Sequence, residues 1–254
     1  MDLNVPDTRQ MEIATRLESG QHLVALELAQ EFAVSVDTIR RDILALEASG
    51  KARRVRGGAV PCATPSAPLH ERIEAEPPAN ADMFRAAIRW ISDAPTLLID
   101  GGRTTLGLID YLPVREDRLI ITPSAWVAVA CQNKGLSVFV LGGMLRPRGG
   151  IATGDACLDR AAEVSADIAI LGACGIDAAF GLSTDDHDEA MVKRALHAAA
   201  SRTMVITQSA KLGRRARHHT LALNDIDAIV TDAAPEALSK LAPDVARRVV
   251  SHHV

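Results

Sequence analysis

The residues best suited to binding a small anion lie in one short stretch, DGGRTTLGLIDYL, which runs from Asp100 to Leu112. An apolar strand is predicted to end at Asp100, and two glycines follow it before Arg103, Thr104 and Thr105 begin a helix. Glycines let a backbone approach a ligand, and the free N–H groups at a helix start bind anions. The guanidinium and the two hydroxyls add hydrogen-bond donors. The stretch predicts a phosphate site, although a plain strand-to-helix turn with threonine caps would have the same spacing.

Polar side chains that follow other predicted strands could contribute to the same site. Asp177 can accept hydrogen bonds from hydroxyl groups, and Lys211 could reach an anion bound at a neighbouring strand end. Glu189 and Lys193 are four residues apart and share a helix face, so they form either an ordinary surface ion pair or a contact for a sugar hydroxyl and a phosphate. Because ligands of open α/β sheets bind at the carboxyl ends of strands, we expect these segments to converge.

A second group of polar residues has the chemistry of DNA recognition. Ser35 has the side chain of a helix N-cap. The helix after it has an apolar face, and its other faces carry Thr38, Arg40 and Arg41. Arginine can pair with guanine in the major groove or clamp a phosphate, and threonine can contact a base or the backbone. These residues predict a helix that enters a groove of DNA.

A basic hairpin is predicted directly after this helix. Cationic residues alternate with Ala52 and Val55 on the way to Gly57 and Gly58 and suit a two-stranded wing that faces phosphates: Lys51, Arg53, Arg54 and Arg56. From Arg40 to Arg56 there are six basic residues and two acidic ones, a local charge of +4. With helices predicted over residues 9–19 and 25–32, the pattern is that of a winged helix-turn-helix. A surface helix with solvated arginines is the alternative.

From residue 96 onward, short apolar runs alternate with helical patterns. Strands are predicted over residues 96–99, 119–121, 138–141, 168–171, 203–206 and 228–230. Helices are predicted over residues 83–92, 104–111, 125–132, 156–164 and 189–200. Short, fully apolar strands that alternate with helices favour a mainly parallel sheet covered on both faces. We therefore expect a DNA-binding domain over residues 1–58, a linker over 59–80 and an α/β ligand-sensing and oligomerisation domain over 81–254.

Composition limits the classes of protein that need to be considered. The 254 residues carry a net charge of −4, so DNA affinity must come from a local basic patch. The four cysteines show no metal-ligand spacing, and we expect reduced structural thiols, no metal and no cofactor. No apolar run approaches the ~20 residues of a membrane span, and no signal region is visible. We expect a cytoplasmic protein that does not contact a membrane.

The N-terminal sequence LAQEFAVSVDTIRRDILALEASGKARRVRGGAV resembles the signature of the DeoR family of bacterial transcriptional regulators. The match includes VS-x-DTIRRD, LE-x-x-G and R-x-x-GGA. The resemblance implies that four residues of the predicted recognition helix face the operator: Ser35, Thr38, Arg40 and Arg41.

The C-terminal part resembles the sensor domain of the same family at D-x-G-x-TT, GG-x-x-R, G-x-x-GID, GLST, EA-x-VKRA and S-x-K-x-G. That domain is similar in fold to ribose-phosphate isomerase, and it commonly responds to a phosphorylated sugar. The resemblance implies a phosphate site at Gly102, Thr104 and Thr105, with sugar contacts from Asp177, Glu189, Lys193 and Lys211. This chain departs from the family pattern in two places, where Arg103 replaces the usual Ser or Thr and Cys174 replaces a frequent Asp or Asn.

Two functions follow as expectations. The first is a repressor of a carbohydrate-metabolism operon, not an enzyme, which binds double-stranded operator DNA as a homodimer or homotetramer. A phosphorylated sugar or related metabolite would release it from the operator. The alternative is a sugar-phosphate isomerase that uses Glu189 or Asp177 as a base; fold similarity permits this reaction but does not imply it.

Overall fold

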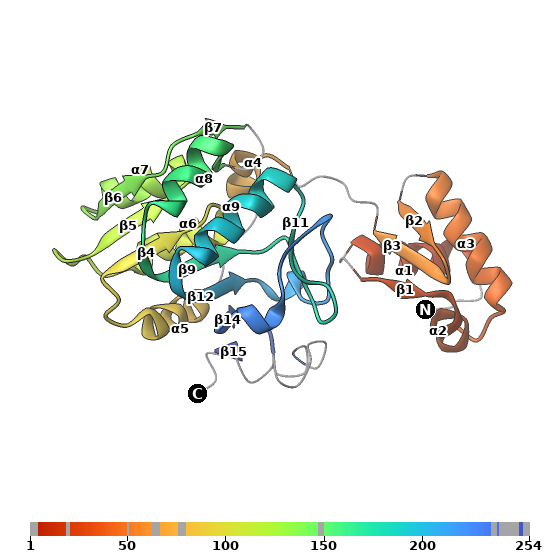
Figure 1. The fold of residues 1–254 in the computed structure, drawn as a ribbon. Helices are drawn as coiled ribbons and strands as arrows, with labels where there is room; N and C mark the ends of the chain where they lie inside the picture. The colour runs from red at the N-terminus through yellow and green to blue at the C-terminus, as the bar shows by residue number, and fades with distance from the viewer. Residues whose placement is uncertain are drawn as a thin grey trace. The chain divides into compact units, whose positions relative to one another are not determined.

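The computed structural model describes residues 5–18, 21–49, 51–61, 67–75, 80–146, 150–234, 238 and 249–250. The chain divides into two compact units, Met1–Thr64 and Pro65–Val254 (Figure 1). Among the described residues, no helix is both long enough and apolar enough to span a membrane.

The first unit is a winged helix-turn-helix, as the sequence predicts. Its helices are α1 (Pro6–Glu18), α2 (Ala25–Glu31) and α3 (Val36–Ala48), and its strands are β1 (Leu23–Val24), β2 (Ala52–Val55) and β3 (Gly58–Pro61). The wing hairpin pairs β2 with β3, and β1 adds a third strand on the other side of β3. The sequence did not reveal β1, because two residues are too few to show an alternating pattern.

Helix α3 is positioned by a cap and by its apolar face. The Ser35 hydroxyl accepts a hydrogen bond from the Thr38 backbone N–H at 3.0 Å, which confirms the predicted N-cap. The core of the unit buries Ile39, Ile43 and Leu46. The helix ends at Ala48, and Gly50, a residue type that commonly ends helices, lies outside the described residues.

The second unit contains a seven-stranded sheet in which every pairing is parallel. Its order is β15-β14-β12-β9-β4-β5-β6. The strands are β4 (Thr96–Ile99), β5 (Leu119–Thr122), β6 (Ser137–Val140), β9 (Ala166–Gly172), β12 (Ala200–Thr207), β14 (Ala228–Thr231) and β15 (Val249–Val250). All six predicted strands are present, and the parallel sheet is confirmed.

Helices cover both faces of this sheet (Figure 1). They are α4 (Leu69–Ala75), α5 (Ala81–Ile91), α6 (Arg103–Leu108), α7 (Ala125–Asn133), α8 (Asp155–Ala162) and α9 (His187–Ala198), and the short 3-10 turn η1 (Ile109–Tyr111) continues α6. Successive residues of a strand point to opposite faces. In β4, Leu97 and Ile99 pack in the core that includes α5 and α7, whereas Leu98 packs in the core that includes α8 and α9.

Two smaller sheets and one helix were not predicted. An antiparallel sheet joins β10 (Gly175–Asp177), β11 (Gly181–Thr184) and β13 (His218–Leu221), and a hairpin joins β7 (Met144–Leu145) to β8 (Ala152–Thr153). Helix α4 and the end of β3 lie within the stretch 59–80 that the sequence suggested as a linker. Leu69 of α4 is buried, so this helix packs on the second unit.

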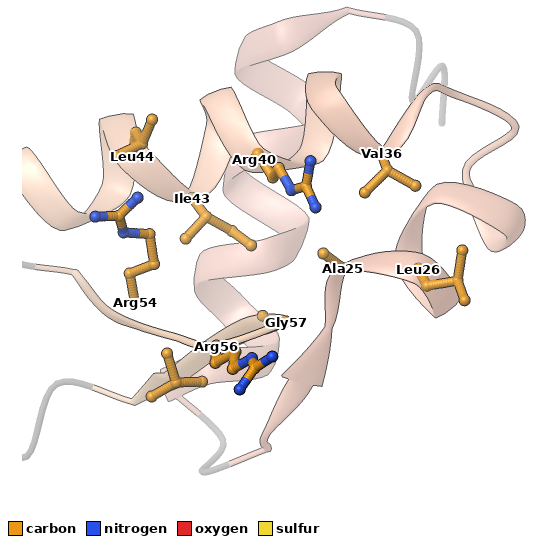
Figure 2. Close-up of a pocket in the computed structure, with 11 residues that line it drawn as sticks. Ala25, Leu26, Val36, Arg40, Ile43, Leu44, Arg54, Arg56 and Gly57 are labelled. Carbon is orange, nitrogen blue, oxygen red and sulfur yellow. The ribbon is translucent and has the colours of Figure 1, made fainter.

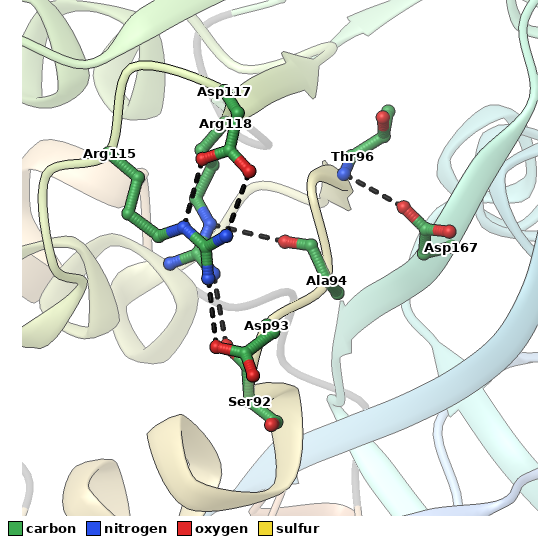
Figure 3. Close-up of polar contacts among 8 residues, drawn as sticks. All are labelled: Ser92, Asp93, Ala94, Thr96, Arg115, Asp117, Arg118 and Asp167. Carbon is green, nitrogen blue, oxygen red and sulfur yellow. Dashed lines mark hydrogen bonds and ion pairs between the residues drawn. The ribbon is translucent and has the colours of Figure 1, made fainter.

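A buried arginine binds backbone carbonyls at the amino-terminal edge of the sheet (Figure 3). Arg118, directly before β5, donates hydrogen bonds to the carbonyl oxygens of Ser92 and Ala94 at 3.0 and 3.2 Å. These carbonyls follow α5, where the helix leaves C=O groups without a helical partner. Burial lowers the pKa of Arg118 from its ordinary value. The residue therefore ties the end of α5 to the start of β5 at the edge opposite the carboxyl ends of the strands.

Candidate ligand site and nucleic-acid interface

The candidate ligand site lies where the winding of the sheet reverses. From β4 the chain goes to β5 and β6 on one side, and then to β9, β12 and β14 on the other side. The carboxyl ends of β4 and β9 therefore flank the topological switch point, where open α/β sheets bind ligands. Asp100 follows β4, and Gly172 ends β9.

Asp100 and Lys193 form a buried ion pair at this point. Asp100 Oδ2 accepts hydrogen bonds from Lys193 Nζ and from the Gly172 N–H, the latter at 3.0 Å. Lys193 also donates to the Gly172 carbonyl at 3.1 Å. Burial acts to lower the pKa of Lys193, but the Asp100 carboxylate raises it, and the net shift is upward. Asp100 Oδ1 is buried and has no hydrogen-bond partner among the described residues.

Glu189 lies one helical turn before Lys193 on α9 and belongs to the same cluster. Its Oε2 accepts a hydrogen bond from the Thr184 hydroxyl at 3.1 Å, and Cys174 Sγ is 3.6 Å from that hydroxyl. Burial raises the pKa of Glu189, although Lys193 opposes the shift. Asp186 caps α9 by accepting from the N–H groups of residues 188 and 189. The predicted Glu189–Lys193 face therefore points into the protein and is not a solvated surface pair.

The predicted phosphate stretch forms the turn from β4 into α6. Gly102 has a φ of +133°, which L-residues with side chains rarely adopt. Its carbonyl accepts hydrogen bonds from the Leu106 N–H at 2.9 Å and from the Thr105 hydroxyl at 3.0 Å. The Thr105 hydroxyl therefore forms a hydrogen bond within the turn itself. Gly102, Arg103 and Thr104 are half-buried. Arg103 also donates to Gln208 Oε1 at 3.2 Å.

Asp177 and Lys211 lie near the carboxyl end of β12. Lys211 ends the short turn η2 (Ser209–Lys211), and the next residue, Leu212, bridges to Ile176 of β10. The Asp177 carboxylate accepts from the N–H groups of Ala179 and Phe180 and pairs with Arg215 at 2.9 Å. Its contacts hold the β10–β11 turn. The contacts that assemble Asp100, Glu189 and Lys193 do not include Asp177.

Sequence reasoning missed two side chains of this region. Thr184 bridges Cys174 and Glu189, and Gln208 binds the guanidinium of Arg103. Thr184 ends the GLST motif directly before α9, and Gln208 directly follows β12. Their places at the ends of elements could have marked them as candidates.

The candidate nucleic-acid interface contains a groove of about 880 Å³ within the first unit (Figure 2). Residues of α3, the start of α2 and the wing line it, with arginines at Arg40, Arg54 and Arg56. Arg40 pairs with Asp37 at 3.0 Å and Arg54 with Glu47 at 3.5 Å, but these side chains are largely exposed. Such pairs are worth ~0–1 kcal/mol, so they leave the guanidinium groups able to turn towards DNA.

The remaining predicted DNA contacts are also accessible. Arg41 and Arg53 are exposed, Ser35 is exposed at the helix cap, and Thr38 is half-buried. Asp42 is one of the two acidic residues counted between Arg40 and Arg56. It is buried, and its carboxylate pairs with Arg9 at 2.5 Å. Within the counted stretch from Arg40 to Arg56, the accessible surface therefore carries one acidic residue, Glu47, against six basic ones.

The first unit is a winged helix-turn-helix, and the α/β unit has a charged cluster at its switch point. These two features together define the class of DNA-binding regulators that have a small-molecule sensor domain. The family model described as the DeoR-like helix-turn-helix domain matches residues 9–64, and the model of the DeoR C-terminal sensor domain matches residues 80–233. The chain belongs to the DeoR family, and it is a DNA-binding transcriptional regulator.

Curated relatives match almost the whole chain. The glycerol-3-phosphate regulon repressor of Escherichia coli (strain K12) is 30% identical over 230 residues, which cover 90% of this chain and 89% of the relative. The transcriptional repressor AccR of Agrobacterium fabrum is 27% identical over 252 residues, which cover 98% of each chain.

The solved structure of the ribose 5-phosphate isomerase of Methanocaldococcus jannaschii aligns with this chain with a TM-score of 0.38 and 17% identity. The alignment covers 52% of this chain and 52% of the isomerase, so it spans about half the length of either protein.

Proposed function

We propose that this protein represses a carbohydrate-metabolism operon and leaves its operator when a phosphorylated sugar or a related metabolite binds the second unit. The observation that carries this proposal is the buried Asp100–Lys193 pair beside Glu189 at the switch point. Asp100 Oδ1 has no partner among the described groups, so a ligand hydroxyl would supply the hydrogen bond that a buried oxygen needs. The names of the relatives support the repressor assignment and, in one case, mention a phosphorylated metabolite.

We expect the half-buried residues of the turn after β4, together with Lys211, to bind the phosphate. Gly102 and Thr104 offer a backbone N–H and a hydroxyl, and Arg103 and Lys211 contribute cationic groups. Together with Asp100, Thr105, Asp177, Glu189 and Lys193, these residues form the proposed ligand-binding set. On the DNA side, the proposed contacts are Ser35, Thr38, Arg40, Arg41, Arg53, Arg54 and Arg56. An isomerase is not favoured, because the relatives that match most of the chain are transcriptional repressors.

Operator release tests this function. Binding of the full chain to DNA from upstream of its own operon is followed by fluorescence anisotropy, with sugar phosphates and glycerol 3-phosphate added in turn. We expect Thr104→Val and Lys211→Ala to keep operator affinity and to lose release by the metabolite. Thr96→Val is the matched control, because Thr96 lies at the other end of β4. Release that persists unchanged in both site variants would refute the proposed phosphate site.

A further inference from the structure

The outer edge of the seven-stranded sheet is unusually apolar for an exposed surface. The 27 residues from Leu119 to Leu145 contain one charged residue, Lys134, in a chain that is 24% charged overall. The ammonium group of Lys134 is held by the protein itself, because its Nζ donates hydrogen bonds to the carbonyl oxygens of Ile109 and Asp110. Helix α7 (AWVAVACQN) has no charged residue.

Large apolar side chains are exposed along this edge. We call them the edge patch: Trp126, Val129, Phe139, Val140, Met144 and Leu145, with exposed fractions between 39% and 66%. Trp126 and Val129 belong to α7, which packs on β5 and β6, and β7 follows β6 after three residues. Figure 1 shows β6 as the outermost strand of the sheet, with α7 next to it.

The edge patch wraps around strand β6. Phe139 is in register with Ile121, whose side chain packs in the core under α8 and α9, so Phe139 points to that face. Val140 points to the opposite face, which α7 covers. Strand β6 has no neighbour on its outer side among the described residues, and its backbone groups there are open to pairing. Natural proteins usually protect such an edge with charges, and this one carries none.

We propose that the edge patch is the interface through which two copies of this chain associate about a two-fold axis next to β6. A two-fold axis brings identical residues together, so charges near it would repel one another, whereas a charge-free patch is complementary to itself. The exposed apolar area is on the order of 500 Å², and the side chains and backbone around it would complete the ~800 Å² per partner of a stable interface.

The role of the chain in DNA binding also indicates a second copy as the occupant. Each chain carries one winged helix-turn-helix, and regulators of this class bind two half-sites about 34–36 Å apart with two copies. The inference thus rests in part on the proposed function, because a repressor needs such a pairing. It is tested without DNA or metabolite, so its failure is distinguishable from a failure of operator binding or of release.

Sedimentation of the full chain measures the association. We expect the wild type to be a dimer or a larger even-numbered assembly, and the double variant Val129→Glu/Val140→Glu to fall to half that mass or less. Like charges placed across the axis should weaken association by at least about 100-fold. Val114→Glu puts the same charge on an exposed valine outside the edge patch and should change nothing. A monomeric wild type, or a double variant that associates like the wild type, would overturn the proposal.

Tryptophan emission gives a second test that needs no charged substitution. The chain has two tryptophans, Trp90 and Trp126, and Trp90 is half-buried against the Arg202 guanidinium, 4.7 Å from its ring. In a Trp90→Phe variant, emission reports on Trp126 alone. We expect it to shift to longer wavelength on dilution through the dissociation range. An assembly that dissociates without any change in this emission would place the interface elsewhere.

Discussion

At the scale of single residues, burial shapes the pKa values of the charged groups in the proposed ligand site. Glu189 and Lys193 both lie in a region from which water is largely excluded, and each has a raised pKa for a different reason. Desolvation favours the neutral form of the Glu189 carboxyl group, whereas the Asp100 carboxylate favours the charged form of Lys193. The cluster therefore combines a cation with a carboxyl group that gives up its proton less readily than an exposed one.

The raised pKa of Glu189 predicts a pH dependence of stability. The folded protein binds this proton more tightly than the unfolded chain, so the contribution of Glu189 to the free energy of unfolding falls as pH rises from the ordinary glutamate pKa through the raised one. Glu189→Gln removes the titrating group, so the variant should gain stability relative to the wild type across that window. Urea unfolding from about pH 4 to about pH 8 measures this difference; a difference that does not vary with pH would contradict the prediction.

Arg41 tests the proposed DNA contacts at the same scale. Its side chain is exposed on α3, and an arginine that binds guanine contributes ~1–3 kcal/mol. Arg41→Ala should weaken operator binding by at least about fivefold, or ~1 kcal/mol, in a gel-shift titration. Arg85→Ala removes an exposed arginine of the second unit and should leave the affinity unchanged. If the two variants bind the operator with equal affinity, Arg41 does not contact DNA.

At the scale of elements, two ion pairs of α1 contrast buried with exposed electrostatics. Arg9 pairs with Asp42 of α3, and both side chains are only 4% exposed. Arg16 pairs with Glu31 of α2 at 2.6 Å, with side chains 24% and 52% exposed. Removing one partner of a buried pair leaves an unpaired buried charge, whereas water solvates the partner of an exposed pair. The orientation of α3 therefore depends on Arg9 much more than on Arg16.

Substitution of each arginine tests this contrast. Arg9→Met should lower the free energy of unfolding of the first unit by about 3 kcal/mol, and Arg16→Met by no more than about 1 kcal/mol. The measurement is denaturant unfolding of the full chain, using the transition that coincides with the loss of operator binding. Similar losses in the two variants would show that burial does not govern these pairs.

At the scale of the whole molecule, operator release requires that two sites in different units influence each other. The proposed DNA contacts lie in the unit Met1–Thr64, and the proposed metabolite site lies in the unit Pro65–Val254. Coupling between two binding sites is reciprocal, because both paths around the binding cycle have the same total free energy.

This reciprocity is itself testable. A metabolite that weakens operator binding by a given factor, ~5–150-fold for typical coupling, must have its own affinity lowered by the same factor when operator is bound. Anisotropy titrations with saturating metabolite, and calorimetric titrations with saturating operator, give the two factors. If the two factors differ, the metabolite does not act through the equilibrium between operator binding and metabolite binding.

The sequence by itself determined most of the helices, six strands of the parallel sheet and the class of protein. The apolar spacing of α3 and the runs that became β4, β5 and β9 follow from local periodicity, which depends on neighbouring residues only. The motifs around Ser35 and Asp100 identified the family, and the family models confirm it. Strand β1 and the β10–β11–β13 sheet were missed, because short strands show too little periodicity to be recognised.

The tertiary structure alone decided which of the candidate residues meet. Asp100 and Lys193 are 93 positions apart, and Arg9 and Asp42 are 33 apart. No local pattern links such residues, because their proximity is set by the strand order and by helix packing. The same order left β6 at the edge of the sheet, so that an apolar stretch that would be core in a central strand is exposed. Burial then gave Glu189 and Lys193 their shifted pKa values, since the cost of removing a charge from water depends on the folded surroundings.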